Sequence, residues 1–417
     1  MPHPSAPASS FPAAAPDRPA AGSETAALRT ATASSFGGFQ DRFYADGVLN
    51  ATSDLPFTYD GWKARGEEAM NPLIAGYVSG GAGDEHTQQA NTTALRRFGL
   101  VPRMMRDRRS RDLSTEFLGR LLPAPVFACP VGVLGAVYPD GDLAVARAMA
   151  ALGLAGMYST LSEAPLEQVA DAARGSWAAF QLYPTTDAEL THSLVRRAEA
   201  AGFDALTITV DTGTLGWRPR DLAHGFIPML RGRCLANYLT DPRFLRLAGV
   251  RQATDLTPYD AGRAWGQVFS NPNFTWDDVR AIRRLTDLPI IIKGICSAGD
   301  AADARREGMD AIACSNHGGR QANGGIAAIH HLAQVLEAAG SLPVTFDSGL
   351  RDGVDILRTV GLGAALAGVG RPMVYALATA GQRGVEHLFS SLLAEADLTM
   401  AVDSYASLAD LRIETAS

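Results

Sequence analysis

The residue types best suited to chemistry follow short apolar runs in the second half of the chain. Lys293 ends the run Pro289-Ile-Ile-Ile-Lys-Gly294, and only two of the 37 basic residues are lysines. A lysine in an apolar strand needs a partner, such as a carboxylate or a bound anion. His317 lies in Ser315-Asn-His-Gly-Gly-Arg-Gln321, and Asp211 follows another apolar run. These residues predict proton transfer with His317 as the base and Asp211 orienting it, although an isolated histidine is more often structural.

Two groups of arginines predict anion binding. The first group consists of Gly349, Arg351, Gly370 and Arg371. It combines flexible backbone, helix N-termini and two guanidinium groups, and such a set suits a phosphate monoester. Pairing with surface carboxylates is the structural alternative for these arginines. Arg218 and Arg320 remain for a carboxylate, which a planar guanidinium binds in bidentate fashion. A phosphate-anchored cofactor, a base and two arginines together predict chemistry on a small organic acid.

The elements that must position these residues alternate between apolar runs and amphipathic segments, which is typical of a parallel α/β sheet. The runs are Val126–Cys129, Gly156–Ser159, Trp177–Leu182, Ala205–Val210, Pro289–Lys293, Ala311–Cys314, Pro343–Phe346 and Ala364–Val369. Eight such units predict an α/β fold of the (β/α)8 (TIM) barrel type, with a doubly wound open sheet as the alternative. In a barrel, polar residues at the carboxyl ends of the strands meet at one rim.

The chain divides by composition into a tail and one large domain. Residues 1–35 are rich in Ala, Pro and Ser and contain six of the 23 prolines, which predicts a disordered tail. Residues 36–417 form the predicted domain, which opens with a helical extension to Arg111. Almost 80 residues separate Val210 from Pro289. We expect a lid insertion over about 212–280, although a structural or oligomer-forming excursion is equally consistent with its distal half.

Charge and hydropathy exclude several classes of protein. The net charge is −7, which argues against a nucleic-acid-binding protein. The segment Leu121–Pro139 carries no charge but contains four prolines, so it predicts a buried strand followed by a loop and no membrane span. The four cysteines are Cys129, Cys234, Cys296 and Cys314. Because they are scattered and lack the spacing of a metal site, they predict reduced thiols in a cytoplasmic protein. His86 follows Asp84 and Glu85, but no second histidine has suitable spacing, so we predict a helix start and no metal.

Several separated motifs together resemble one enzyme family. Ser315–Gln321, Pro289–Gly294, Phe180-Gln-Leu-Tyr183 and Gly370-Arg-Pro372 occur in the order found in the FMN-dependent α-hydroxy-acid oxidising enzymes. The resemblance extends from about Phe36 to near the C-terminus. Within the family, the chain is most similar to the lactate 2-monooxygenases. That similarity rests on the segments Tyr77–Thr87, Gly216–Leu222, Cys314–Gly325 and Leu392–Leu398.

The resemblance implies roles for the matching residues. His317 would be the base held by Asp211, and Lys293 would stabilise the reduced flavin near its N1–O2 edge. The substrate carboxylate would be bound by Arg218, Arg320 and the hydroxyls of Tyr77 and Tyr183. The isoalloxazine ring would contact Pro130, Val131, Gly132, Ser159, Gln181 and Thr209. The ribityl chain and phosphate would be held by Asp347, Gly349, Arg351, Gly370 and Arg371.

The resemblance also implies the reaction. We expect FMN-dependent oxidation of an L-2-hydroxy acid, with lactate and O2 giving acetate, CO2 and water. A peroxide-releasing oxidase or a dehydrogenase acting on lactate or a bulkier hydroxy acid is the alternative, and a flavin-binding protein without turnover is a third possibility. A homotetramer or homo-octamer is expected. Two departures stand out: Asp211-Thr-Gly213 where the family often has Asp-Thr-Pro, and Asp347-Ser-Gly349 where Asp-Gly-Gly is commoner.

Overall fold

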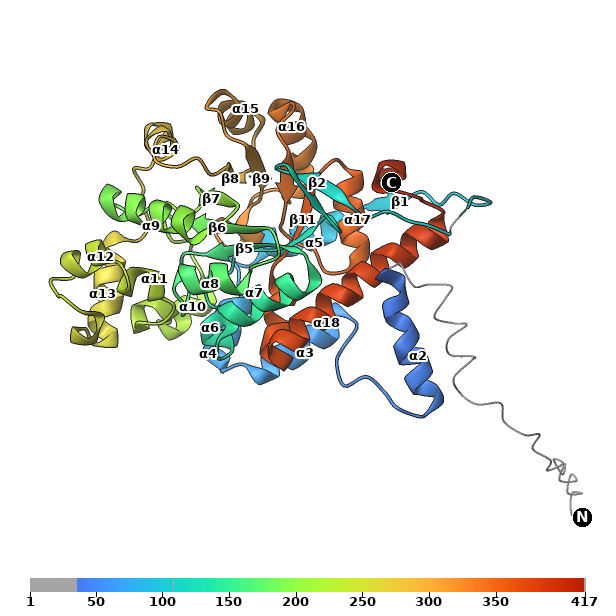
Figure 1. The fold of residues 1–417 in the computed structure, drawn as a ribbon, viewed down its shortest axis with the longest axis horizontal. Helices are drawn as coiled ribbons and strands as arrows, with labels where there is room; N and C mark the ends of the chain where they lie inside the picture. The colour runs from blue at the N-terminus through green and yellow to red at the C-terminus, as the bar shows by residue number, and fades with distance from the viewer. Residues whose placement is uncertain (1–35, 108, 416–417) are drawn as a thin grey trace, which may run out of the picture.

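The computed structural model describes residues 36–107 and 109–415, in which eight parallel strands close into a barrel (Figure 1). The strands are β4 (Val126–Ala128), β5 (Ala155–Ser159), β6 (Ala178–Leu182), β7 (Ala205–Thr209), β8 (Ile290–Ile295), β9 (Ala311–Cys314), β10 (Val344–Phe346) and β11 (Leu366–Val369). Each lies within two residues of its predicted bounds. Because β11 pairs with β4 through Ala367 and Val126, the sheet is closed. The (β/α)8 prediction is confirmed, and the open sheet is excluded.

Helices surround the barrel and connect its strands. They are α7 (Gly141–Leu152), α8 (Leu166–Ala172), α9 (Ala188–Ala201), α14 (Trp276–Arg283), α15 (Ala298–Arg306), α16 (Ile329–Ala339), α17 (Gly353–Gly361) and α18 (Arg371–Asp403). Several begin at side-chain caps: Asp187 accepts from Leu190 N before α9, and Asp352 accepts from Asp355 N before α17. Strand side chains alternate between this helical layer and the barrel interior, where Phe127, Met157 and Ile291 pack.

The N-terminal extension is helical, as predicted, and packs on α18. It comprises η1 (Phe36–Gln40), α2 (Asp41–Val48), α3 (Tyr59–Ala69), α4 (Pro72–Ser79) and α5 (His86–Leu95). Helix α3 lies along α18, where a Cβ at Gly66 would come within 2.7 Å of the Tyr375 Cα (Figure 1). The predicted tail, residues 1–35, lies outside the described residues.

Two small antiparallel sheets were not predicted. Strand β1 (Phe98–Leu100) pairs with β12 (Ile413–Thr415), which joins the start and end of the domain. Strand β2 (Thr115–Phe117) pairs with β3 (Arg120–Leu122). In this hairpin, the Phe117 ring packs edge-on against Trp177 at 5.2 Å. The uncharged segment Leu121–Pro139 contains the end of this hairpin, β4 and, in the part predicted as a loop, the short helix α6 (Leu134–Val137). No helix among the described residues is long and apolar enough to cross a membrane.

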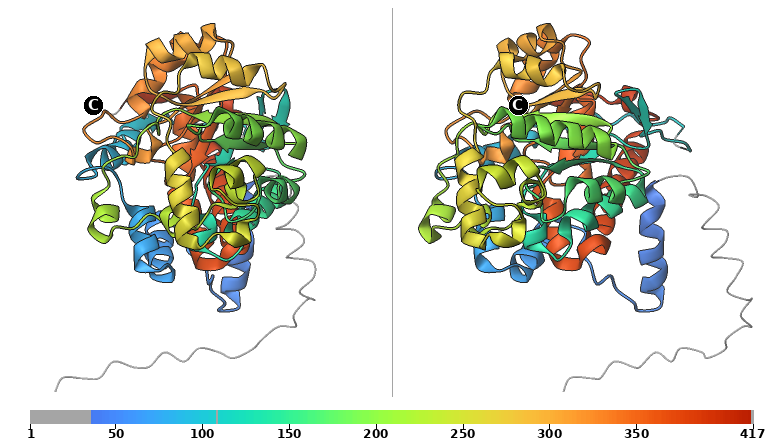
Figure 2. Two further views of the ribbon diagram at one scale, coloured as in Figure 1. Left: turned by 90° about the vertical axis from the view of Figure 1, so that its left-hand side faces the viewer. Right: turned by 60° about the vertical axis from the view of Figure 1, so that its left-hand side comes forward.

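The long insertion follows β7. It contains α10 (Pro219–His224), η2 (Pro228–Arg231), α11 (Ala236–Leu239), α12 (Pro242–Leu247), η3 (Ala253–Asp255) and α13 (Pro258–Val268). Its middle part packs beside α8 and α9, where Arg197 donates to the Asn237 carbonyl at 2.8 Å (Figures 1 and 2). Met229 and Trp265 instead line the cavity at the rim of the barrel. The first and last parts of the insertion therefore line the cavity, and its middle is structural. The structural excursion considered for the distal half lies instead in the middle.

Candidate active site

A cavity of about 500 Å³ opens at the carboxyl ends of the strands. It brings together most of the predicted site residues: Tyr77, Pro130, Val131, Gly132, Tyr183, Arg218, Lys293, His317, Arg320, Asp347, Gly349, Arg351, Gly370 and Arg371. Four predicted residues do not line it. Asp211 lies behind His317, Ser159 is buried beside Gly132, and Gln181 hydrogen bonds to Thr209, which lines an adjoining smaller cavity.

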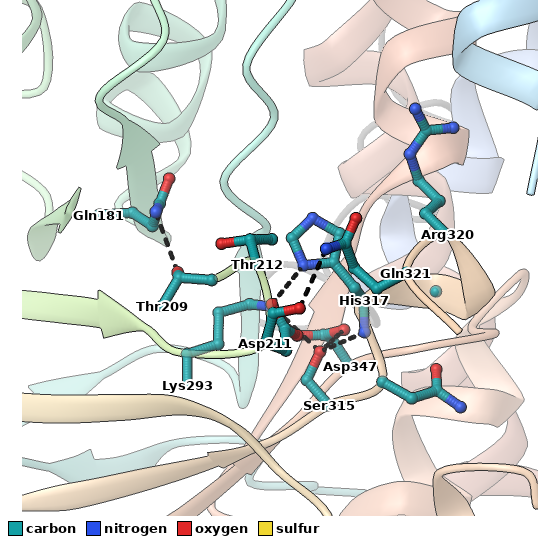
Figure 3. Close-up of polar contacts among 12 residues, drawn as sticks. Gln181, Thr209, Asp211, Thr212, Lys293, Ser315, His317, Arg320, Gln321 and Asp347 are labelled. Atoms are coloured by element: carbon teal, nitrogen blue, oxygen red, sulfur yellow. Dashed lines mark hydrogen bonds and ion pairs between the residues drawn. The ribbon is translucent and has the colours of Figure 1, made fainter. Parts of the chain in front are cut away.

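The candidate base is joined directly to a carboxylate. His317 Nδ1 lies 2.8 Å from Asp211 Oδ1 (Figure 3). Burial opposes ionisation of Asp211, but electrostatic attraction to His317 and Lys293, together with the hydrogen bond from His317, outweighs it and lowers the pKa of this carboxyl. Burial lowers the pKa of His317 below its ordinary value, although Asp211 opposes the shift. A neutral imidazole that donates through Nδ1 to ionised Asp211 keeps Nε2 as the proton acceptor.

The loop that carries His317 is held in an unusual backbone conformation. His317 has φ 58°, and the following Gly318 and Gly319 have φ 64° and 74°. Residues His317–Gly319 form a 3-10 turn (η4), which Asn316 caps by accepting from Gly319 N at 3.2 Å. A Cβ at Gly319 would lie 2.5 Å from the Gln88 nitrogen of α5. Glycine is therefore required for the close approach of this loop to α5.

Lys293 has the carboxylate partner that its burial demands. Its Nζ lies 3.5 Å from Asp347 Oδ2 and donates to Ser315 Oγ at 3.0 Å. Ser315 Oγ in turn donates to Asp347 Oδ1 at 2.7 Å and accepts from His317 N at 3.1 Å. Burial favours the neutral amine, but attraction to Asp347 and Asp211 prevails and raises the pKa of Lys293. The lysine therefore contributes a fixed positive charge to the lining of the cavity.

Arg320 and Arg218 lie together on the other side of His317. Arg320 Nη1 donates to the carbonyls of Tyr77 and Gly80, both at 2.6 Å, whereas its buried Nη2 has no hydrogen-bond partner among the described residues. Arg218 Nε donates to the Arg320 carbonyl at 3.1 Å, and its Nη2 contacts Gln321 Oε1. The Tyr77 ring lies beneath both guanidinium groups, 4.8 Å from Arg320 and 5.9 Å from Arg218. Unpaired donors on buried arginines suit a substrate carboxylate.

The arrangement opposite the base fits a flavin. Gln181 Nε2 donates to Thr209 Oγ1 at 2.9 Å, and its buried Oε1 has no partner within the described ranges. A free amide oxygen and a hydroxyl match the donors and acceptors of a pyrimidine edge. The glycines at 132, 349 and 370 leave room for close approach to the backbone. The lining of the cavity therefore fits FMN: Lys293 would lie beside the ring and Arg351 would hold the phosphate, with Gln181 and Thr209 available at the adjoining end.

Arg371 lines the cavity as predicted, but most of its N–H groups already have protein partners. It donates to the carbonyls of Val78, Gly318 and Gly80 at 2.9–3.1 Å, and it also contacts Gln88 Oε1. Because these contacts use four of its five N–H groups, it has one left for a phosphate. Burial, reinforced by Arg320 and Arg351, lowers the pKa of Arg371 to about 9. In this arrangement Arg371 chiefly fastens the segment before α5 to the His317 loop.

Three residues of the site had no predicted role. Gln321 Nε2 donates to the carbonyls of Asp211 and Thr214, both at 3.0 Å, and so joins the base to the arginines. Ser315 connects Lys293 with the His317 loop, and Ser348 accepts from two backbone N–H groups of that loop. The signal for Gln321 and Ser315 was their place in the motif around His317.

His86 begins α5, and Asp84 Oδ1 accepts a hydrogen bond from the His86 backbone nitrogen at 3.2 Å, as expected for a helix start.

The fold and the site define the class of protein: a (β/α)8 barrel with a flavin-sized cavity, a histidine–aspartate pair and two neighbouring arginines at its rim. The FMN-dependent dehydrogenase family model matches residues 66–416. An L-lactate oxidase from Lysinibacillus sphaericus is 38% identical over 345 residues, which are 82% of this chain and 87% of that protein. An FMN-dependent alpha-hydroxy acid dehydrogenase from Penicillium citrinum is 34% identical over 380 residues, 90% of this chain and 94% of that protein.

A solved structure of mandelate oxidase with (S)-4-hydroxymandelic acid superposes with a TM-score of 0.77 at 34% identity. The match covers 86% of this chain and 99% of that chain. The chain therefore belongs to the FMN-dependent α-hydroxy-acid dehydrogenase family, and FMN is its cofactor.

Proposed function

We propose that this FMN-dependent hydroxy-acid-oxidising enzyme acts on L-lactate as a lactate 2-monooxygenase, giving acetate, CO2 and water. The observation that carries its chemistry is one cavity lined by His317, which Asp211 holds from behind, and by Arg320, whose Nη2 has no hydrogen-bond partner in the described part of the chain. A base and a carboxylate-binding group at adjoining positions fit a substrate whose hydroxyl is next to its carboxylate.

Each side chain then has a defined task. Arg320 and Arg218 bind the substrate carboxylate, with the hydroxyls of Tyr77 and Tyr183 beside it. His317 Nε2 takes the proton of the substrate hydroxyl, and Asp211 stabilises the imidazolium that forms. Lys293 would hold a positive charge beside the bound flavin. When bound, FMN supplies the acceptor for the two electrons of the α-C–H bond and the site at which O2 is reduced.

The insertion supports retention of the first products. Leu230, Trp265 and Phe269 form part of the cavity wall, and Trp265 stacks on Phe269 at 4.4 Å. Pyruvate and hydrogen peroxide held together behind this wall react to give acetate, CO2 and water. If pyruvate leaves first, the enzyme is a peroxide-releasing oxidase. The alternative, an oxidase or dehydrogenase acting on lactate or a bulkier hydroxy acid, is favoured by the same apolar wall, which offers contacts to a larger side chain.

Product analysis separates these reactions. The purified enzyme is mixed anaerobically with L-lactate, with L-2-hydroxy acids of increasing side-chain length and with L-mandelate, and the rate of flavin bleaching is recorded. Air is then admitted, and acetate, pyruvate and peroxide are quantified. One acetate per lactate with little peroxide is expected. Stoichiometric pyruvate and peroxide would refute the monooxygenase reaction, and faster bleaching by a bulkier acid would refute lactate as the substrate.

The remaining parts of the proposal concern the state of the protein in the cell. We propose a cytoplasmic homotetramer or homo-octamer without nucleic-acid or membrane partners, by analogy with the family. Light scattering on the purified holoenzyme would give the subunit number directly. A monomeric mass at micromolar concentration would contradict the proposed assembly.

A further inference from the structure

Ser348 has a backbone conformation that an L residue rarely adopts. It follows β10 in Asp347-Ser-Gly349, its φ is 95°, and only 6% of its surface is exposed. Glycine would adopt this φ without steric strain. A buried serine in such a conformation must be held there by other interactions, and residues of this kind concentrate at functional sites.

The hydroxyl of Ser348 makes every hydrogen bond that a hydroxyl can make. Its Oγ accepts from Asn316 N at 3.3 Å and from Gly318 N at 3.0 Å, and it donates to Asp347 Oδ1 at 3.0 Å. The two backbone N–H groups belong to the residues on either side of His317. A single oxygen atom therefore holds both ends of the peptide segment that carries the imidazole.

We propose that Ser348 is a positioning residue for His317, and that the chain retains backbone strain at φ 95° in order to keep this hydroxyl. The inference rests on the proposed role of His317 as the base. Ser348 acts through the loop: its partners are the nitrogens at 316 and 318 and the carboxylate of Asp347, which also pairs with Lys293. The hydroxyl thus fixes the distance between the loop of the base and the lysine beside the ring.

Other contacts to the same loop do not replace this one. Asn316 and Asn91 exchange two side-chain hydrogen bonds at 2.8 and 2.9 Å, which attaches the loop to α5. Ser315 Oγ accepts from His317 N. Neither contact satisfies the N–H groups of Asn316 and Gly318, so the loss of Oγ would free the backbone on both sides of His317. A small displacement of a base reduces rate strongly, because proton transfer depends on its distance from the substrate.

Two substitutions separate the hydroxyl from the strain. Ser348→Gly removes both, and Ser348→Ala removes the hydroxyl but keeps a Cβ at φ 95°. With saturating FMN, we expect both variants to reduce flavin about tenfold more slowly or worse in anaerobic single turnover. The Kd of the hydroxy acid should stay within about threefold because the arginines are unchanged. The melting temperature of Ser348→Gly should be higher than that of Ser348→Ala.

The outcomes are distinct. If the role is only structural, the rate follows stability, and Ser348→Gly reduces flavin at the wild-type rate, which would overturn the proposal. Hydrogen exchange adds a readout independent of turnover: the peptide covering residues 315–320 should exchange faster in both variants, and unchanged exchange would equally overturn it. Ser404→Gly is the matched control, because Ser404 also has positive φ, 61°, at the end of α18. It should change neither the reduction rate nor exchange in that peptide.

The proposed function is tested in the same series. Wild-type enzyme that no hydroxy acid reduces, or a His317→Ala variant that is reduced normally, would refute the role of the base. The exchange measurement would still report whether Ser348 holds the loop.

Discussion

Replacing Asp211 by asparagine tests how much the carboxylate contributes to the base. The side chain keeps its shape, and its Oδ1 still accepts from His317 Nδ1, now 2.8 Å away. Only the negative charge is lost. With charge centres about 4 Å apart and an effective dielectric constant of about 20, one carboxylate stabilises the imidazolium by about 4 kcal/mol.

The electrostatic stabilisation of the imidazolium by Asp211 can be converted into an expected change in the rate of flavin reduction. At about 1.36 kcal/mol for each tenfold change, full expression of 4 kcal/mol in the transition state corresponds to about 10³-fold. Because the proton is only partly transferred at that point, we expect flavin reduction to slow by about 10²- to 10³-fold. The acid limb of the pH profile should also move. Burial already lowers the pKa of His317, and removing Asp211, which raises it, lowers it further, so the limb shifts to lower pH.

The assay is anaerobic stopped-flow absorbance of the flavin with saturating L-lactate between pH 5 and 9. Asp171→Asn serves as the control, since Asp171 pairs with Arg174 on the surface of α8. A reduction rate within about fivefold of wild type would refute the electrostatic role assigned to Asp211. If the acid limb of the pH profile moved to higher pH, the conclusion that Asp211 raises the pKa of His317 would be refuted.

Three further substitutions have defined outcomes. Lys293→Met should slow flavin reduction severely, because Asp347 and the ring lose their cation, whereas Lys63→Met on α3 should leave the rate unchanged; equal effects would contradict the role of Lys293. Arg320→Lys should raise the Kd of the hydroxy acid by about tenfold or more, measured by flavin titration. A lysine has a single nitrogen and lacks the planar fork that directs Nη1 to the carbonyls and Nη2 to a carboxylate; an unchanged Kd would contradict carboxylate binding there. Asp397→Ala should lower the free energy of unfolding by about 3–5 kcal/mol in urea titration. The substitution leaves Arg111 and the Gly37 N–H buried without this carboxylate. A loss below about 1 kcal/mol would contradict this stabilising role of Asp397.

Periodicity and strand-end position predicted the barrel and the meeting of its polar residues. The reason is physical: parallel strands of similar length bring their carboxyl ends to one rim, so His317 and Asp211 meet although 106 residues separate them. Lys293 was predicted to need an anionic partner, and Asp347 supplies it. The two-stranded sheets were missed because their short strands are partly exposed and lack the continuous buried apolar run that marks the equally short β4 and β10.

The support of the site could not be predicted from local pattern. Arg371 donates to carbonyls near residue 80, about 290 positions earlier in the chain. The sequence of neither segment indicates this contact. Ser348 was visible as a departure from the commoner glycine. Its φ of 95° and its bonds to the His317 loop follow only from the arrangement of β9 and β10.

The central claim, that His317 serves as the base for oxidation of an L-2-hydroxy acid, is tested most directly by anaerobic mixing of the FMN-loaded enzyme with L-lactate. Wild-type enzyme should lose its flavin absorbance within a single turnover. The His317→Ala variant should bind FMN and remain oxidised. Bleaching of the variant at the wild-type rate, or wild-type flavin that stays oxidised with every L-2-hydroxy acid offered, would contradict the claim.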